Sequence, residues 1–217
     1  MTDEIKRMLF FARKTLRDYS HHKGSLRMIG YSKYDHTLRV MSWLKRLYEH
    51  CDFKERVRYE DVLIAAALHD VGYAAAEDAR EHAVSGAGIC REQLERAGFP
   101  EERVRYITFL VRHHSEKGRM ADPEIDPGLL LLMEADLLDD TGALSVVIDC
   151  RAEQAKAPEN GFEACLEHIR AHTLRHQEGK NPMVTPWGRQ VWNEKCEIAR
   201  RFAASLEQDL PDVEFRL

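Results

Sequence analysis

Apolar residues recur every three or four positions along almost the whole chain, and no segment shows the strict alternation that a half-buried strand requires. This spacing places apolar side chains on one face of successive helices. We therefore predict an all-α fold, a helical bundle. The expected helical segments are Asp3–Tyr19, a segment that starts after Ser32 and reaches His50, Glu60–Val71, Ala79–Ala97, Glu101–Ser115, Gly128–Ala155 (broken near Gly142), Phe162–His176 and Pro186–Gln208.

Helix starts are marked by capping residues. Asp126 precedes Pro127 and Thr185 precedes Pro186, the arrangement of an N-cap followed by a first-turn proline. The chain has no internal repeat, low-complexity segment or glycine- and serine-rich linker. We predict a single domain over residues 1–217, with a core at about 30–155 and a helical C-terminal extension packed on it.

Composition excludes several classes of protein. The formal net charge is −5, so no basic excess exists for general nucleic-acid binding. No run approaches the roughly 20 apolar residues of a membrane helix, and the first residues do not resemble a signal peptide. The five cysteines are widely spaced and form no CxxC pair. We expect a cytoplasmic protein with reduced thiols and no membrane association.

Ionisable residues interrupt the apolar faces of four predicted helices. His36 lies on the stripe of Val40, Trp43 and Leu47, and His69 follows Val62, Ala65 and Ala66. Asp136 follows Leu129, Leu132 and Met133, and His114 continues the face of Val104, Ile107 and Val111, whereas His113 falls about a quarter turn away or more. Each position would be expected to hold an aliphatic residue.

A buried imidazole or carboxylate costs several kcal/mol unless it is paired or bound to a metal. One histidine on an apolar face is usually a hydrogen-bonded core residue. Four such helices suggest instead that the groups converge on a divalent cation. Asp70, next to His69, can join them if the helix ends near Gly72. Nitrogen and oxygen ligands without a thiolate favour Fe, Mn, Ni, Co or Mg.

The motifs that carry these residues resemble a known family. His36 in YDHTLRV, the doublet in AAALHDVGY and Asp136 in MEADLLDDTGAL, in that order, resemble the HD-domain superfamily of metal-dependent phosphohydrolases. The similarity runs from about His36 to Leu206, and the stretches VRHHS and MVTPWGRQVWNEKCEIARRFAASL resemble a branch of small stand-alone bacterial members. The resemblance implies a single-domain bundle of the HD-domain type.

The resemblance also implies a ligand set. In the family, His36, His69, Asp70 and Asp136 would bind a first metal. Some branches add two histidines and a second metal bridged by the doublet's aspartate. The positions of these two histidines match His82 and His114, with His113 as the alternative to His114. The branch that cleaves cyclic dinucleotides has a lysine shortly after the doublet, where this chain has Tyr73, so we discount that activity.

The expected reaction is hydrolysis of a phosphate ester or anhydride by a metal-activated water, with Asp70 as proton acceptor. Arg39, Lys117 and Arg119 are candidates for binding the substrate's phosphate. The expected partner is a small phosphorylated metabolite, a nucleotide or dinucleoside polyphosphate, and the protein could be a homodimer. Two alternatives stay open: a di-iron oxygenase of the same superfamily, which uses six ligands, and a non-catalytic nucleotide-sensing module.

Overall fold

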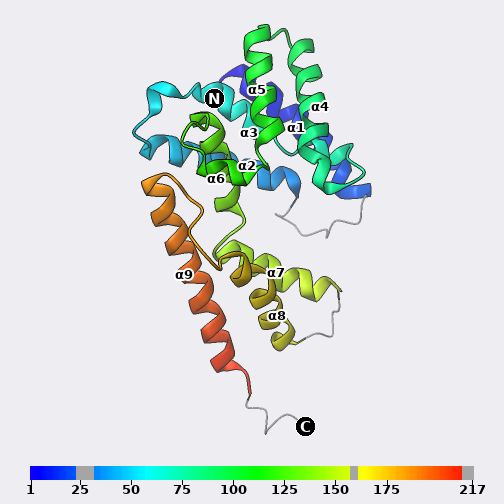
Figure 1. Ribbon diagram of the computed structural model, residues 1–217. Coiled ribbons are helices and arrows are strands. Elements are labelled where there is room, and N and C mark those ends of the chain that lie inside the picture. The colour runs from blue at the N-terminus through cyan, green and yellow to red at the C-terminus, as the bar shows by residue number, and fades with distance from the viewer. Residues whose placement is uncertain (23–31, 157–160, 212–217) are drawn as a thin grey trace. The chain divides into compact units, whose positions relative to one another are not determined.

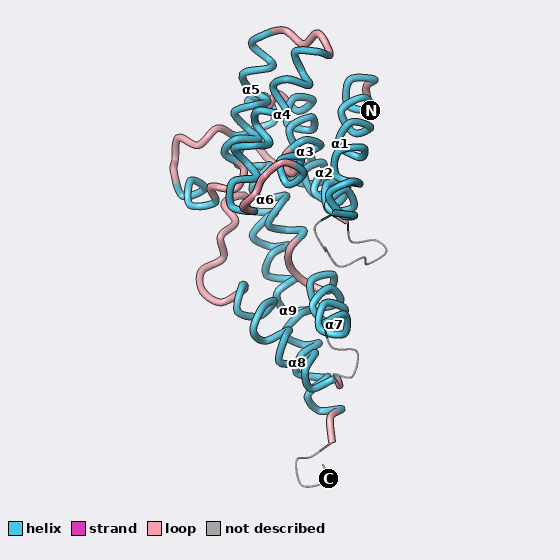
Figure 2. The backbone as a smooth tube through the Cα atoms, turned by 90° about the vertical axis from the view of Figure 1, so that its right-hand side faces the viewer, coloured by secondary structure: helices cyan, strands magenta, loops and turns pink. Residues whose placement is uncertain are grey.

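The computed structural model describes residues 1–22, 32–156 and 161–211, and all regular structure within these ranges is helical (Figure 2). The predicted all-α fold is therefore confirmed. The α-helices of the described residues are α1 (Asp3–His22), α2 (Lys33–His50), α3 (Tyr59–Leu68), α4 (His82–Arg96), α5 (Glu101–His113), α6 (Pro127–Asp139), α7 (Ala143–Lys156), α8 (Phe162–Ile169) and α9 (Pro186–Asp209).

The chain divides into two compact units, Met1–Asp136 and Leu137–Leu217. The core range of about 30–155 expected from the sequence does not coincide with either unit. Whether the chain folds as one domain stays a prediction. None of the described helices is long and apolar enough to cross a membrane.

Helix α3 lies at the centre of the first unit and packs against α1, α2 and α5 (Figure 1). Its residues from Ile64 to Leu68 are fully buried. A helix that is apolar on all sides is one that neighbours surround, and the three consecutive alanines within it allow those neighbours to approach closely. The end of α3 is consequently held in the interior of the unit.

The predicted caps are formed. The Asp126 carboxylate accepts a hydrogen bond from the Leu129 N–H at 2.9 Å, and the Thr185 hydroxyl accepts one from the Gly188 N–H at 3.1 Å. Helix α2 has a complete capping box, in which the Ser32 and Asp35 side chains each accept from the other's backbone N–H. This cap fixes the first turn of α2, the turn that carries His36.

Helix α3 ends at Leu68, three residues earlier than the sequence predicted. Asp70 has left the helical conformation, with φ −100° and ψ 2°, and a 3₁₀ turn, η2 (Val71–Ala74), follows. Gly72 in that turn touches α4 so closely that a Cβ there would lie 1.9 Å from the carbonyl oxygen of His82. The turn η2 therefore packs directly against the backbone of α4, and this contact sets the path of the chain after α3.

The second unit contains α7, α8 and α9 with a π-helical turn, η5 (Arg170–Leu174), which continues α8. The sequence predicted one continuous helix, Phe162–His176, and did not distinguish this π turn. The apolar core of this unit is formed by Val146, Leu166, Ile169, Ala199 and Ala203.

Candidate metal centre

Four side chains from three segments of the first unit meet next to the C-terminal end of α3. His36 lies on the first turn of α2, His69 and Asp70 follow α3, and Asp136 lies on α6. The Nε2 atom of His36 is 3.3 Å from His69 Nε2 and 3.1 Å from Asp136 Oδ1. It is 3.6 Å from Asp70 Oδ2. The structure thus brings together the four residues that the family resemblance implies for a first metal.

A second group shares Asp70 with the first. His82, at the start of α4, and His114, just after α5, have their Nε2 atoms 3.1 Å apart. These atoms lie 3.6 Å and 3.7 Å from Asp70 Oδ1. His36, His69 and Asp70 could hold one ion, and Asp70, His82 and His114 could hold another. Asp70 presents Oδ2 to His36 and Oδ1 to His82 and His114, and Oδ1 also lies 3.6 Å from His69 Nε2, so the two groups share this carboxylate.

The side chains of the adjacent residues His69 and Asp70 reach the same centre because α3 ends at Leu68, immediately before them. Within a helix their side chains would diverge by about 100°. The non-helical backbone of Asp70 removes that divergence, as the sequence analysis required. Both side chains are almost fully buried.

Backbone carbonyls orient two of the histidines. The Nδ1–H of His69 donates to the Ala66 carbonyl at 2.8 Å, and that of His114 donates to the Val111 carbonyl at 2.7 Å. A carbonyl only accepts, so Nδ1 carries the proton and the neutral ring presents its Nε2 lone pair to the centre. These lone pairs face the carboxylate oxygens of Asp70 and Asp136. A divalent cation relieves the repulsion among all of these groups at once, so the donor set fits a metal.

The electrostatics of the centre keep its groups in the ligating state. Burial lowers the pKa of His69 to about 4, so the ring is neutral at neutral pH. Burial raises the pKa of Asp70, but His69 and Lys33 outweigh it and the pKa lies well below its usual value. Burial likewise opposes the ionisation of Asp136, and Lys117 and His36 hold its pKa well below the usual value.

The four remaining residues that the sequence analysis proposed, three for phosphate binding and one as an alternative ligand, lie at different distances from the centre. Lys117 reaches the centre, with Nζ 2.6 Å from Asp136 Oδ2. Arg119 lies against Glu116 at 3.5 Å and over the ring of Phe109. Arg39 is half-buried one turn beyond His36 on α2. The Nδ1–H of His113 donates to the Glu116 carboxylate at 2.9 Å, whereas His114 Nε2 lies 3.7 Å from Asp70 Oδ1, which favours His114 as the ligand.

Lys33 is a centre residue that the sequence analysis missed. Its Nζ is 3.0 Å from Asp70 Oδ2 and lies 4.1 Å from the centroid of the Tyr73 ring. Tyr73 in turn stacks on His82, with ring centroids 4.2 Å apart. The signal was present, because Lys33 is three residues before His36 and therefore on the same face of α2.

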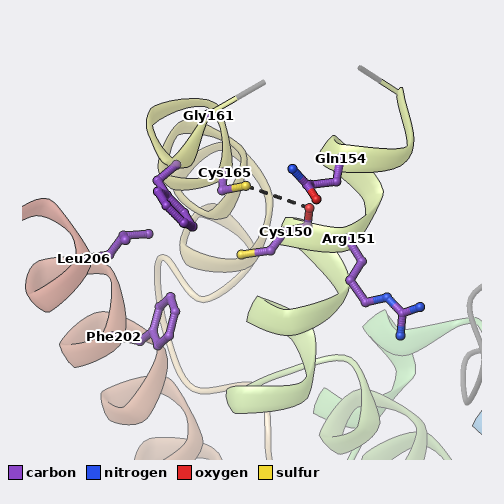
Figure 3. Close-up of a pocket in the computed structure, with 8 residues that line it drawn as sticks. Cys150, Arg151, Gln154, Gly161, Cys165, Phe202 and Leu206 are labelled. Carbon is purple, nitrogen blue, oxygen red and sulfur yellow. Dashed lines mark hydrogen bonds between the residues drawn. The ribbon is translucent and has the colours of Figure 1, made fainter. Parts of the chain in front are cut away.

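Two further cavities lie in the second unit, each of about 440 Å³. One is lined mainly by apolar groups, including Phe202, Leu206 and the thiols of Cys150 and Cys165 (Figure 3). The Cys165 thiol donates to the Cys150 carbonyl at 3.8 Å. The other is lined by polar groups that include Asp149 and His172. Neither lining contains a residue that the sequence analysis proposed as a metal ligand.

Fold and site together define an all-α protein with a buried histidine–aspartate centre suited to divalent metals. A family model described as HD domain matches residues 34–141, the range that contains all six candidate ligands. The chain belongs to the HD-domain superfamily, as the motifs indicated. HD domains bind divalent metals, and the two groups described above could hold them.

Crystal structures with the same fold come from several bacteria. A predicted HD-superfamily hydrolase from an uncultured Thermotogales bacterium is 19% identical, with TM-score 0.61, covering 94% of this chain and 91% of that one. An HD-superfamily hydrolase from Bacillus thuringiensis is 19% identical, with TM-score 0.68 and coverage of 95% and 96%. Bacillus subtilis YpgQ in complex with ADP is 18% identical, with TM-score 0.65 and coverage of 97% and 96%. No curated protein sequence matches.

Proposed function

We propose that this chain is a metal-dependent phosphohydrolase that cleaves a phosphate ester or anhydride of a nucleotide or dinucleoside polyphosphate. The observation that carries the proposal is the convergence of imidazole lone pairs and two carboxylates on one buried volume. Hydrolase neighbours of the same fold support the reaction class. The ADP bound to the YpgQ protein supports a nucleotide as the ligand class.

His36, His69, Asp70 and Asp136 would hold one divalent ion, and Asp70, His82 and His114 would hold a second. When bound, such ions polarise a phosphoryl oxygen and lower the pKa of water. The pKa of Asp70 lies well below its usual value, so this carboxylate is ionised, and we assign it as the group that would accept a proton from the attacking water. Lys117, whose Nζ lies 2.6 Å from Asp136 Oδ2, would neutralise charge on the phosphate.

The test compares metal content and activity in matched variants. We expect His69→Ala and Asp70→Ala to lose bound metal and phosphatase activity together, measured by elemental analysis and a nucleotide screen with Mn²⁺ or Mg²⁺. Circular dichroism should show that the helical content survives. Full activity in either variant would contradict the proposal.

The neighbouring histidines provide an internal control for the second ion. His114→Ala should lose metal that His113→Ala retains, because only His114 faces Asp70. If His113→Ala lost metal and His114→Ala did not, the assignment of the second group would be wrong.

One specific observation favours a second candidate, a di-iron oxygenase. The six residues of its ligand set lie close together, with Asp70 common to the two groups and Asp136 3.1 Å from His36: His36, His69, Asp70, His82, His114 and Asp136. The two functions separate by their reaction conditions. Phosphate release with Mn²⁺ or Mg²⁺ under anaerobic conditions identifies the hydrolase, whereas iron-bound protein that consumes O₂ during turnover identifies the oxygenase.

A further inference from the structure

Two lysines outside the ligand set place their ammonium groups at the ligand carboxylates. Lys33 Nζ lies 3.0 Å from Asp70 Oδ2, and Lys117 Nζ lies 2.6 Å from Asp136 Oδ2. The side chains are 32% and 26% exposed, so each extends between the buried centre and solvent. They come from different segments, the start of α2 and the turn η4 (Lys117–Ala121).

Each lysine is held in place by a second contact. The ammonium group of Lys33 lies over the Tyr73 ring, which is itself stacked on His82. Lys117 also donates to the Met133 carbonyl at 3.3 Å. Both positions are therefore defined by the residues around the centre and not only by attraction to the carboxylates.

The positive charge of the two lysines excludes them as metal ligands. If a cation were bound to a ligand oxygen, an ammonium group 3 Å from that oxygen would be repelled by it, because both carry positive charge. The positive charge of two divalent cations would already exceed the negative charge of the two ligand carboxylates. The lysines therefore add positive charge that only a strongly anionic ligand matches.

We propose that Lys33 and Lys117 form a two-point phosphate site, which selects ligands with two or more linked phosphates over ligands with one. The proposal rests on the proposed function and names its substrate class. Lys33 takes phosphate oxygens on the Asp70 side of His36, and Lys117 takes them on the Asp136 side, because His36 Nε2 contacts both carboxylates. Both lysines are assigned here to binding and orienting the ligand, not to the proton transfers.

The test measures binding directly, on the Mn²⁺-loaded full chain, by calorimetry. The probes are imidodiphosphate, a hydrolysis-resistant pair of linked phosphates, and inorganic phosphate. We expect the wild type to prefer imidodiphosphate. Lys33→Met and Lys117→Met should each weaken imidodiphosphate binding by about tenfold or more and phosphate binding by less, since one charge-assisted hydrogen bond is lost. Manganese content should be unchanged or higher.

Two further variants separate binding from folding. Lys33→Arg keeps the charge and should retain most of the imidodiphosphate affinity, and the methionine variant should lose that affinity while its manganese content does not fall. Lys45→Met, on the exposed face of the same helix where Lys45 pairs with Glu49 at 3.7 Å, should bind like the wild type. Thermal melting of each variant identifies any that fails to fold, and the arginine variant then carries the comparison.

The outcomes distinguish the failure of the two-point phosphate site from the failure of the proposed phosphohydrolase function. Equal binding of the two probes by the wild type, or unchanged imidodiphosphate binding in both methionine variants, overturns the two-point site while leaving hydrolysis to stand. Selective imidodiphosphate binding without hydrolysis of any phosphate compound overturns the proposed function and leaves the site.

Discussion

Replacing Gly72 by alanine tests how the second ligand group is positioned. A Cβ at Gly72 would lie 1.9 Å from the His82 carbonyl oxygen and 2.4 Å from the Gly86 amide nitrogen. Ordinary van der Waals contact begins near 3.4 Å, so η2 and α4 must separate by about 1.5 Å. Both obstructing atoms belong to backbone and cannot rotate away.

The expected cost follows from that displacement. Overpacking a closed contact destabilises a protein by about 1–3 kcal/mol, and this contact is backbone against backbone, so we expect about 3 kcal/mol in the free energy of unfolding. His82 moves with α4, while His36 and His69 do not. The variant should therefore lose the ion proposed for His82 and His114 before the ion proposed for His36. A shift of 1 Å or more also lowers activity by about a hundredfold.

The measurements are urea unfolding of the metal-free protein and elemental analysis of the loaded protein. Gly88→Ala is the matched control, because Gly88 is also on α4 but a Cβ there meets nothing within 4 Å. Alanine is favoured over glycine inside a helix by about 1 kcal/mol, so this variant should be slightly stabilised with full metal content. Wild-type stability and metal content in Gly72→Ala would refute the proposed role of this contact.

Three further predictions concern buried ionisable groups. The metal-free protein should lose up to about 3 kcal/mol of stability as the pH falls from 6.5 to 4. Burial lowers the pKa of His69 to about 4 in the folded chain, so in this pH range the unfolded chain binds a proton at His69 and the folded chain does not. Urea unfolding at several pH values measures this loss. Burial raises the pKa of the Cys90 thiol to about 12, so iodoacetamide at pH 8 should leave it unmodified, by mass spectrometry, until the protein unfolds. Asp61→Ala should cost about 3 kcal/mol in urea unfolding, because the buried Asp61 carboxylate accepts from Arg103 at 2.7 Å and pairs with Arg58 at 3.0 Å.

Exposed residues supply the controls for these predictions. His69→Gln should flatten the pH dependence of stability, because it removes the group whose pKa burial lowers. Glu101→Ala removes an exposed partner of Arg91 and should change stability by less than about 0.5 kcal/mol. Alkylation of Cys90 in the folded protein, or an Asp61→Ala variant as stable as Glu101→Ala, would contradict the burial on which the predictions depend.

The sequence by itself was sufficient for the helices and for which residues face inward. The repeat of apolar positions and the capping residues act over one or two turns, so they can be interpreted without knowing what the helix packs against. His36, His69 and Asp136 stood out because each replaced an aliphatic residue on such a face. His82 required the family resemblance, because its place at the first residue of α4 gives no full turn of pattern before it.

Only the tertiary structure decided how these faces meet. The Asp70 carboxylate reaches both ligand groups because α3 ends at Leu68, three residues before the pattern predicted. Lys33 joins the centre across 37 residues of chain, and Gly72 is required by a contact with Gly86 on another helix. Local patterns carry no information about such distances, because the approach of two helices depends on the side chains of both and on every layer packed around them.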